Sequence, residues 1–302
     1  MLTQRAAVGI EDLAIAASLM SGAWRTEAPH VAATPASIEW WYALTHPDPL
    51  GDHLRLWFDG SQPVAWTWHE PPELESHVWT GDAARDQAVF AAIIEAALEE
   101  AAGGELGAFA ADDDGASIEV LRERGFEAAG RRLTQWQHRL AVALPSAQLP
   151  SGYRIRGLAG PEEFDDRVAL HRAAFATSRL IAEKYRRLLS VTHYRLEDDL
   201  VVEVPDGSLA AFALSWYDPD GLVGELEPVG THPHHQRRGL SRAVVTAAVE
   251  RLHERGARVV QVYSDMAEGA AEALYAAVGF ERHATHQRYA VGSSDARGTP
   301  RP

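Results

Sequence analysis

The chain has 302 residues, of which 46% are hydrophobic and 24% are charged, a globular composition with room for two ordinary domains. Its 43 acidic residues outnumber 28 lysines and arginines, and the resulting net charge of -15 excludes general attraction to nucleic acids or anionic membranes. Without cysteine it has no disulfides, no thiolate metal ligands and no cysteine nucleophile. An anionic ligand therefore needs a local basic site.

The N-terminus lacks the charged-then-apolar order of a signal peptide, because Glu11 and Asp12 interrupt its first apolar run. No stretch approaches the ~18 consecutive apolar residues of a membrane-spanning helix. We expect a cytoplasmic protein with no membrane partner.

The N-terminal half, residues 1–145, shows helical and strand periodicities in alternation. In chain order the pattern predicts a strand at 5–8, helices at 10–20 and 35–42, strands at 53–58, 63–69 and 77–79, a helix at 86–102, a strand at 106–110, a helix at 116–124 and a strand at 133–144. Thr34 followed by Pro35 is a typical helix start. The adjacent aromatics Trp40, Trp41 and Tyr42 either pack between elements or domains, or line an acceptor pocket.

The segment 146–152 holds prolines and a Ser-Gly pair with little periodicity, so it is predicted to be a linker. The pattern restarts in residues 153–291 and ends in a tail, 292–302, that we expect to be disordered. The second half is predicted to contain a strand at 153–156, helices at 162–175 and 182–190, strands at 200–204, 209–217 and 222–229, a helix at 240–255, a strand at 259–263, a helix at 268–278 and a strand at 282–291.

The two halves end alike, with Gly125-Phe126-Glu127 and Gly279-Phe280-Glu281 each preceding a final strand. The shared order of elements indicates a tandem duplication of one α+β unit. The halves differ at the chemically interesting positions, because acids at Asp82 and Asp86 and a leucine at Leu121 stand opposite the basic turn and the tyrosine described below. The N-terminal half is therefore predicted to be a degenerate, catalytically silent copy.

A basic turn opens the long helix of the second half. Arg237, Arg238, Gly239 and Arg242 lie at this helix start without an intervening acid. Unpaired backbone amides and the helix macrodipole favour an anion there. The stretch is a candidate phosphate cradle.

Together these features resemble the GNAT acetyltransferase superfamily, whose acyl-CoA motif Gln/Arg-x-x-Gly-x-Gly/Ala is similar to Gln236-x-x-Gly239-x-Ser241. A second signature is similar to Leu274-Tyr275-x-x-x-Gly279-Phe280. The resemblance is specific over residues 200 to 290, and the tandem layout is similar to mycothiol synthases and other double-GNAT proteins, with no motif that selects that substrate. It implies two GNAT-like domains, each a mixed, mostly antiparallel sheet flanked by helices.

The resemblance also implies roles for individual residues. Acetyl-CoA would be the co-substrate, held by Val229, Gly230, Thr231, Gln236, Arg237, Arg238, Gly239, Leu240, Ser241 and Arg242. Tyr275 would protonate the departing thiolate. Where the family often has an asparagine contacting the cofactor, this chain has Glu268.

The strand itself supplies two further features. Glu225 and Glu227 share one strand face, and Glu227, nearer the cradle, is the candidate general base or a solvated strand residue. Pro228 removes a ladder donor, which predicts a bulge or a local opening of the strand.

Other polar and aromatic residues carry weaker signals. His232, His234 and His235 fit a polar loop better than a metal site, so no metal is expected. The helices that border the acceptor in this family would carry His171, Phe175, Lys184 and Tyr185.

The sequence thus predicts an acyl-CoA-dependent N-acetyltransferase that acts on an amine of an unidentified small-molecule acceptor by direct attack in a ternary complex. The acidic surface favours a cationic amine through steering. The alternative is a catalytically silent acyl-CoA-binding or regulatory protein.

Overall fold

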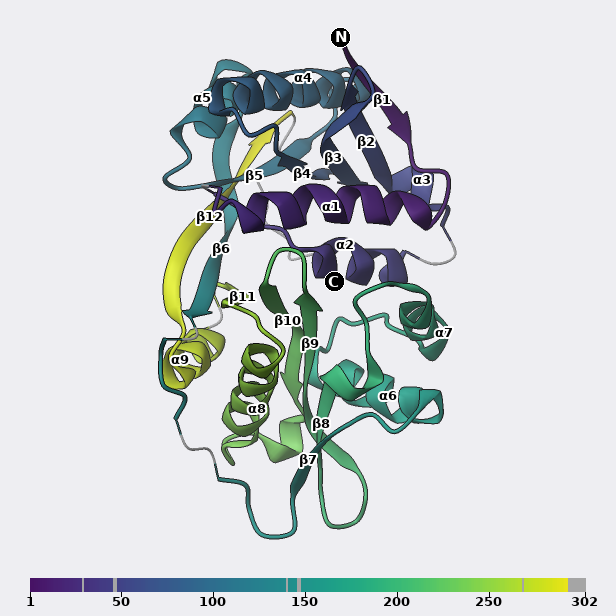
Figure 1. Ribbon diagram of the computed structural model, residues 1–302, viewed down its shortest axis with the longest axis vertical. Helices are drawn as coiled ribbons and strands as arrows, with labels where there is room; N and C mark the ends of the chain where they lie inside the picture. The colour runs from purple at the N-terminus through teal and green to yellow at the C-terminus, as the bar shows by residue number, and fades with distance from the viewer. Residues whose placement is uncertain (29, 46–47, 140, 146–147, 268, 293–302) are drawn as a thin grey trace. The chain divides into compact units, whose positions relative to one another are not determined.

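The computed structural model describes residues 1–28, 30–45, 48–139, 141–145, 148–267 and 269–292 (Figure 1). Among these residues no helix combines the length and the apolar character needed to cross a membrane. The predicted linker therefore lies partly outside the described residues, as do Glu268 and all but the first residue of the predicted tail. The chain divides into two compact units.

Unit 1 comprises described residues within 1–33, 48–135 and 283–292. Its elements are β1 (Leu2–Ala6), α1 (Glu11–Arg25), α3 (Leu50–His53), β2 (Leu54–Asp59), β3 (Gln62–Glu70), β4 (Glu73–Val78), α4 (Ala83–Ala101), β5 (Leu106–Ala111), α5 (Gly115–Glu123), most of β6 (Glu127–Arg139) and most of β12 (Glu281–Val291). The strand order is β1-β2-β3-β4-β5-β12-β6. The sheet is mixed, because β4 and β5 are parallel whereas β1 to β4 and the β5-β12 pair are antiparallel.

Unit 2 comprises described residues within 34–45 and 136–282. Its elements are α2 (Pro35–Leu44), β7 (Arg154–Gly157), α6 (Phe164–Ala174), α7 (Ala182–Arg186), β8 (Asp199–Glu203), β9 (Leu209–Asp218), β10 (Val223–Thr231), α8 (Leu240–Glu254), β11 (Val259–Asp265) and α9 (Gly269–Val278), with 3-10 turns at Pro161–Glu163, Arg187–Ser190, Leu196–Asp198 and Pro233–His235. The strand order is β11-β10-β9-β8-β7, antiparallel except for the β10-β11 pair.

These units differ from the two contiguous halves predicted from the sequence. Strand β12, from the end of the chain, pairs antiparallel with β5 from His286↔Ala111 to Val291↔Leu106. Arg288 strengthens this pairing through ion pairs with Glu73 and Glu105. Helix α2, from the first half of the sequence, belongs to unit 2. The predicted division into contiguous halves is wrong because the units are set by pairing between distant segments, and local periodicity carries no information on such pairing.

The local predictions hold more closely. Helix α2 begins after Thr34, whose side chain accepts a hydrogen bond from the Ala36 amide in a capping box with Ser37. The predicted strand 133–144 begins earlier and ends at Arg139, because β6 runs straight on from the turn at Gly125. Most predicted elements have the predicted type, but α3 and the 3-10 turns at Leu196–Asp198 and Pro233–His235 were not predicted, and the predicted helix 182–190 ends in the 3-10 turn Arg187–Ser190. Each unit is an α+β sandwich of sheet and helices.

The sheet of unit 2 separates two apolar clusters. One face of β9, with Ala211 and Ala213, packs with α8 residues such as Val244 and Val245. The opposite face, with Phe212 and Trp216, packs with α2, α6 and α7. This second face carries the pocket at Glu225, whereas α8 and Tyr275 pack with the first face.

Candidate active site

The basic turn before α8 has the geometry of an anion cradle. Gly239 caps the helix in the left-handed conformation with φ 80°, and Arg237 is also left-handed with φ 58°. Left-handed non-glycine residues of this kind mark strained turns that are common at binding sites. A Cβ added at Gly239 would meet no atom within 4 Å, so the space in front of the helix start is open.

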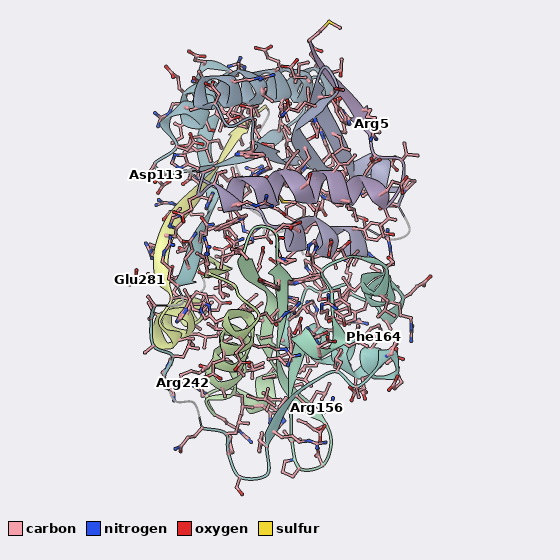
Figure 2. All side chains as sticks on the ribbon, viewed as in Figure 1. Arg5, Asp113, Arg156, Phe164, Arg242 and Glu281 are labelled. Atoms are coloured by element: carbon pink, nitrogen blue, oxygen red, sulfur yellow. The ribbon has the colours of Figure 1, made fainter. Side chains whose placement is uncertain are left out.

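The cradle's side chains are exposed and uncommitted to carboxylates. Gln236, Arg237, Arg238 and Arg242 are all exposed, and Figure 2 marks Arg242 on α8. Within the part of the chain that the structure describes, neither Arg237 nor Arg242 forms an ion pair, and Arg238 donates to the Tyr153 hydroxyl at 3.1 Å. The amides of the first helical turn have no intrahelical acceptor, so this region can hold a phosphate.

Ser241 occupies the last small position of the motif. Its hydroxyl hydrogen-bonds to the Thr231 hydroxyl at 2.7 Å, which ties the helix start to the end of β10. The hydroxyl group that serine adds, compared with the glycine or alanine of the motif, is therefore held by the strand. Leu240 is buried beneath the turn and anchors it to the core.

Strand β10 opens where Pro228 interrupts it, as predicted. Its parallel pairing with β11 covers Val223–Glu225 and Val259–Gln261, and its register with β9 shifts between Leu226 and Val229. The Trp216 indole donates to the Glu227 carbonyl at 2.7 Å and fixes the irregular segment. Beyond it, Val229, Gly230 and Thr231 still pair with β9. An extended ligand could therefore pair only with the opposite edge of β10, the edge that faces β11 earlier in the strand.

Glu225 is the most enclosed carboxylate at this point. It is 2% exposed and accepts hydrogen bonds from Thr34, from Ser37 at 3.4 Å and from Gln261 at 3.1 Å. Burial raises the pKa of Glu225, and these hydrogen bonds, followed by one with Glu227, oppose the rise. The two carboxyl groups thus form a pair on one strand face, with Glu227 as its more exposed member.

Tyr275 lies in the core of unit 2. It is 5% exposed, and its ring centroid is 6.4 Å from Trp136 and 5.8 Å from Phe280. Helix α9 ends at Val278 and is followed by Gly279, with φ 103°, so that the Phe280 amide donates to the Tyr275 carbonyl at 3.0 Å. The signature glycine and phenylalanine therefore fix this tyrosine by packing.

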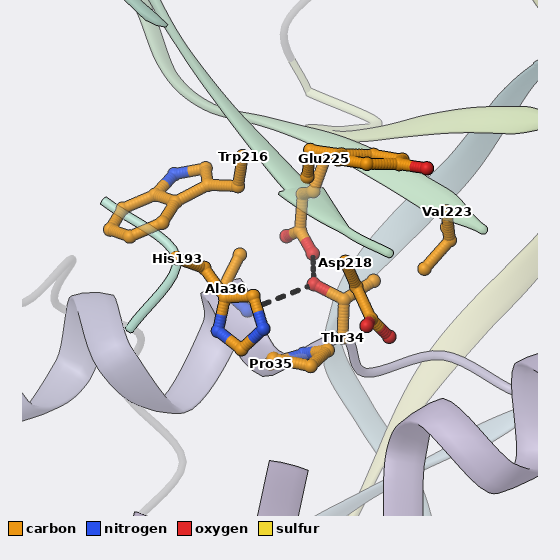
Figure 3. Close-up of a pocket in the computed structure, with 9 residues that line it drawn as sticks. Thr34, Pro35, Ala36, His193, Trp216, Asp218, Val223 and Glu225 are labelled. Carbon is orange, nitrogen blue, oxygen red and sulfur yellow. Dashed lines mark hydrogen bonds between the residues drawn. The ribbon is translucent and has the colours of Figure 1, made fainter. Parts of the chain in front are cut away.

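A small pocket lies beside Glu225 (Figure 3). It is lined by Thr34, Pro35, Ala36, His193, Trp216, Tyr217, Asp218, Val223 and Glu225. Three segments distant in sequence build it: the start of α2, the loop at His193, and the end of β9 together with the start of β10. Sequence reasoning missed Thr34, His193 and Asp218 as site residues because no local pattern places these segments together.

His193 is held by a buried partner on α2. Its Nδ1 atom is 2.7 Å from Glu39 Oε1, and Glu39 also accepts from the backbone amides of Thr192 and His193. Burial alone would lower the pKa of His193, but the hydrogen bond and charge of Glu39, with the charges of Asp218 and Asp220, raise it above 6.5.

This shift predicts a pH-dependent contribution to stability. A pKa raised in the folded state stabilises the protein fully below the unfolded value of 6.5, and the contribution is lost as pH rises through the folded value. The difference in free energy of unfolding between wild type and His193→Gln should therefore be larger at about pH 6 than at about pH 8. Urea denaturation at both values measures it, with exposed His234→Gln as control; a difference that grows with pH contradicts the pairing.

The remaining candidates from the sequence are mostly structural. Tyr185 is buried and donates to Asp199, whereas Lys184 donates to the Leu44 carbonyl at 2.6 Å. His171 packs 4.8 Å from the Phe175 ring, and burial lowers the pKa of His171 to about 3. These residues hold α2, α6 and α7 together behind the pocket.

The structure also shows where the aromatic run and the histidine cluster lie. Trp40 is 4% exposed and packs against His171 and Tyr185, which confirms packing between elements rather than a place in the pocket lining. His232, His234 and His235 stack in a loop beside the cradle. Of the residues the structure describes, no three His, Asp or Glu side chains are grouped as metal ligands.

Unit 1 fills the corresponding helix start with its own carboxylates. Asp82 caps α4 by accepting from the Arg85 amide at 2.9 Å. Asp86 accepts from the amide and hydroxyl of Thr80, both at 2.7 Å. Leu121, opposite the signature tyrosine, is fully buried.

Comparison with known proteins agrees with this geometry. Residues 168–280 match the Acetyltransferase (GNAT) family. A tandem GNAT protein from the clavulanic acid biosynthesis pathway has the same fold, with a TM-score of 0.62 and 17% identity over 98% of this chain and all of that one. A GCN5-related N-acetyltransferase from Sphaerobacter thermophilus gives a TM-score of 0.63 and 15% identity, covering 96% and 95% of the two chains. Residues 168–280 thus match a GNAT acetyltransferase domain, and the chain as a whole has the fold of a tandem double-GNAT protein.

Its curated relatives are more specific in name. Mycothiol acetyltransferases from Clavibacter sepedonicus and Thermobispora bispora are 28% and 27% identical to it over 252 residues. The first alignment covers 81% of this chain and 78% of the relative, and the second covers 80% and 84%. The Kineococcus radiotolerans mycothiol acetyltransferase is 32% identical over 65% of this chain and 66% of the relative. Acetyl-CoA is the co-substrate general to this family.

Proposed function

We propose that this protein transfers the acetyl group of acetyl-CoA to an amine of a small-molecule acceptor by direct attack in a ternary complex, in unit 2. The observation that carries the proposal is the convergence of an open edge of β10, the exposed basic cradle at the start of α8, and a carboxylate pair of which Glu225 is buried and Glu227 half-buried. The name shared by the curated relatives makes a mycothiol-related amine the first acceptor to test.

The co-substrate would occupy the two features that follow Pro228. Its pyrophosphate would lie against the amides and arginines of residues 236–242, and its pantetheine arm would extend along Val229, Gly230 and Thr231. Gly230 suits this region because a Cβ there would collide with Phe212 at 2.5 Å. Unit 1, whose helix start is occupied by Asp82 and Asp86, would not bind acetyl-CoA.

The reaction would require a general base for the amine and a general acid for the thiolate. A carboxylate of the Glu225–Glu227 pair takes a proton from the amine, whose nitrogen forms a bond to the thioester carbonyl carbon. The carbon–sulfur bond breaks, and Tyr275 protonates the departing thiolate. Glu227 remains the candidate base, and Glu225, whose pKa burial raises, is the neighbour that shares its proton.

Two substitutions test the carboxylate pair. Glu225→Gln and Glu227→Gln should each lower kcat/KM about 100-fold or more, the range expected for loss of general base catalysis. In the wild type, kcat/KM should fall as pH is lowered through the raised pKa of Glu225, because a protonated carboxyl group cannot accept the proton of the amine. Initial rates of CoA release across pH measure both effects.

The double variant and a surface variant complete the comparison. Because the pair acts as a unit, the double variant Glu225→Gln/Glu227→Gln should have a kcat/KM no lower than that of the less active single variant. Glu250→Gln, on the exposed side of α8, should keep wild-type activity. If only Glu227→Gln keeps full activity, Glu225 is the general base. If both single variants keep full activity, neither carboxylate of the pair is the base.

Thioester consumption with a panel of small amines tests the function itself. We expect acetyl-CoA consumption that depends on the amine and yields an acetylated product. If acetyl-CoA binds but no amine, including a mycothiol-related one, is acetylated, the protein is instead an acyl-CoA-binding or regulatory protein.

A further inference from the structure

Thr34 and Ser37, the capping box of α2, both donate to one oxygen of Glu225. Glu225 Oε2 accepts from the Thr34 hydroxyl, from the Ser37 hydroxyl at 3.4 Å and from the Gln261 side-chain amide at 3.1 Å. An ionised carboxylate only accepts hydrogen bonds, so donors that converge on it favour the ionised form. All three donors are uncharged. The ionised form of this buried carboxylate therefore depends on hydrogen bonds.

The helix cap fixes the direction of the Thr34 hydroxyl. Thr34 Oγ1 accepts from the Ala36 amide at 3.2 Å and donates its single hydrogen to Glu225 (Figure 3). Ser37 Oγ has the same double role, because it accepts from the Thr34 amide at 3.3 Å and donates to Glu225. The start of α2 adds the positive end of the helix dipole. The first turn of α2 is thus arranged around a negative charge at Glu225.

Helix capping alone does not explain the hydroxyl group of Thr34. A cap needs only an acceptor for the helix amides, and Asp82 and Asp114 supply carboxylates for this purpose at α4 and α5. An aspartate in place of Thr34 would put a second carboxylate against Glu225. The threonine hydroxyl both accepts and donates, which is what a cap beside an ionised carboxylate requires.

The Thr34 hydrogen bond opposes the effect of burial on Glu225. Burial raises the pKa of Glu225, and the bond from Thr34 is the largest influence that lowers it, followed by the bond from Gln261 on β11. Removing the Thr34 hydroxyl should therefore raise this pKa further. The other titratable groups around the carboxylate are Glu227 on β10, Asp218 at the end of β9, and His193 with its partner Glu39 on α2.

We propose that Thr34 is a positioning residue for acetyl transfer: its hydroxyl holds Glu225 in place and ionised within the carboxylate pair that accepts the proton of the amine. The inference rests on the N-acetyltransferase function proposed above. It adds to that site a residue from the first half of the sequence, outside both family signatures. Thr34 acts on the reaction only through Glu225.

Thr34→Val removes the hydroxyl and keeps the shape of the side chain. Its kcat/KM should begin to fall at a pH about one unit higher than in the wild type, since a hydrogen bond to a charged acceptor has about that strength. Above this range, its kcat/KM should match the wild type. Thr34→Ser keeps the hydroxyl and should restore the wild-type pH profile. Asp114→Ala, which loses the cap of α5 in unit 1, controls for lost helix capping and should leave the profile unchanged.

An NMR titration follows the ionisation of Glu225 without any reaction. The protein is labelled with glutamate that is isotope-enriched at the side-chain carboxyl carbon, and the Glu225 signal is identified by its loss in Glu225→Gln. The pKa of Glu225 should be about one unit higher in Thr34→Val than in the wild type or in Thr34→Ser.

The two measurements separate this inference from the proposed function. A raised pKa of Glu225 with an unchanged pH profile of kcat/KM supports the hold of Thr34 on Glu225 and overturns only the proposed carboxylate base. An unchanged pKa of Glu225 in Thr34→Val, or an equal shift in Thr34→Ser, overturns the inference. If Thr34→Val does not fold, Thr34→Gly takes its place under the same criteria, because glycine caps a helix nearly as well.

Discussion

Replacing Gly239 with valine is expected to abolish acetyl-CoA binding. The residue is left-handed, with φ 80°, and the space beside its Cα is open, so a branched side chain would both strain the turn and occupy the region in front of the α8 amides. A pyrophosphate needs that close approach to the backbone. Calorimetric titration with acetyl-CoA should detect no binding.

Gly103 provides a control of the same kind. It is also left-handed, with φ 85°, and has no atom within 4 Å of an added Cβ, but it lies after α4 in unit 1. Valine at either position should cost about 1–2 kcal/mol of stability because of the left-handed backbone. Gly103→Val should bind acetyl-CoA normally. Retained affinity in Gly239→Val would show that the turn before α8 is not the phosphate site.

Tyr275→Phe is expected to lower kcat by about 100-fold to 10,000-fold, the contribution typical of general acid catalysis. The phenyl ring keeps the contacts with Trp136 and Phe280, so acetyl-CoA affinity should stay at the wild-type value. Single-turnover kinetics with a saturating amine separates the chemical step from binding.

Tyr289→Phe is the matched control for this effect. Tyr289 is also 5% exposed, but it lies in the apolar cluster of unit 1. Its loss of a hydroxyl should leave kcat unchanged. If Tyr275→Phe also retains wild-type kcat, Tyr275 is a packing residue and the proton for the thiolate comes from elsewhere.

The parts of the fold and site that the sequence predicted depend on local chemistry. Thr34 before Pro35 marks the start of α2, Pro228 marks the interruption of β10, and the glycine and arginines of residues 236–242 mark the turn at the start of α8. In each case a residue type imposes its own backbone constraint or carries its own charge. The structure places all three where the pattern indicates.

The parts that were missed depend on contacts between distant segments. No periodicity indicates that β12 pairs with β5, that the capping Thr34 donates to Glu225, or that Asp218 lines the pocket. Strand alternation shows that Glu225 and Glu227 share a face, but it cannot show that α2 covers Glu225 and leaves Glu227 more exposed.

The duplication accounts for why one site is proposed instead of two. The helix start in unit 1 has Asp82 and Asp86 hydrogen-bonded to backbone amides, so its positive pole is already satisfied and a phosphate would meet two carboxylates. The equivalent turn in unit 2 carries Arg237, Arg238 and Arg242. The same element order thus presents opposite charge at the two positions.

The most direct test of the account is the ratio of acetylated amine to released CoA in one reaction, with both products quantified by mass spectrometry. Direct transfer from acetyl-CoA to a bound amine predicts one acetylated amine for each CoA, and no CoA release above the uncatalysed rate when the amine is omitted. CoA release without a matching acetylated amine would contradict the proposed N-acetyltransferase mechanism.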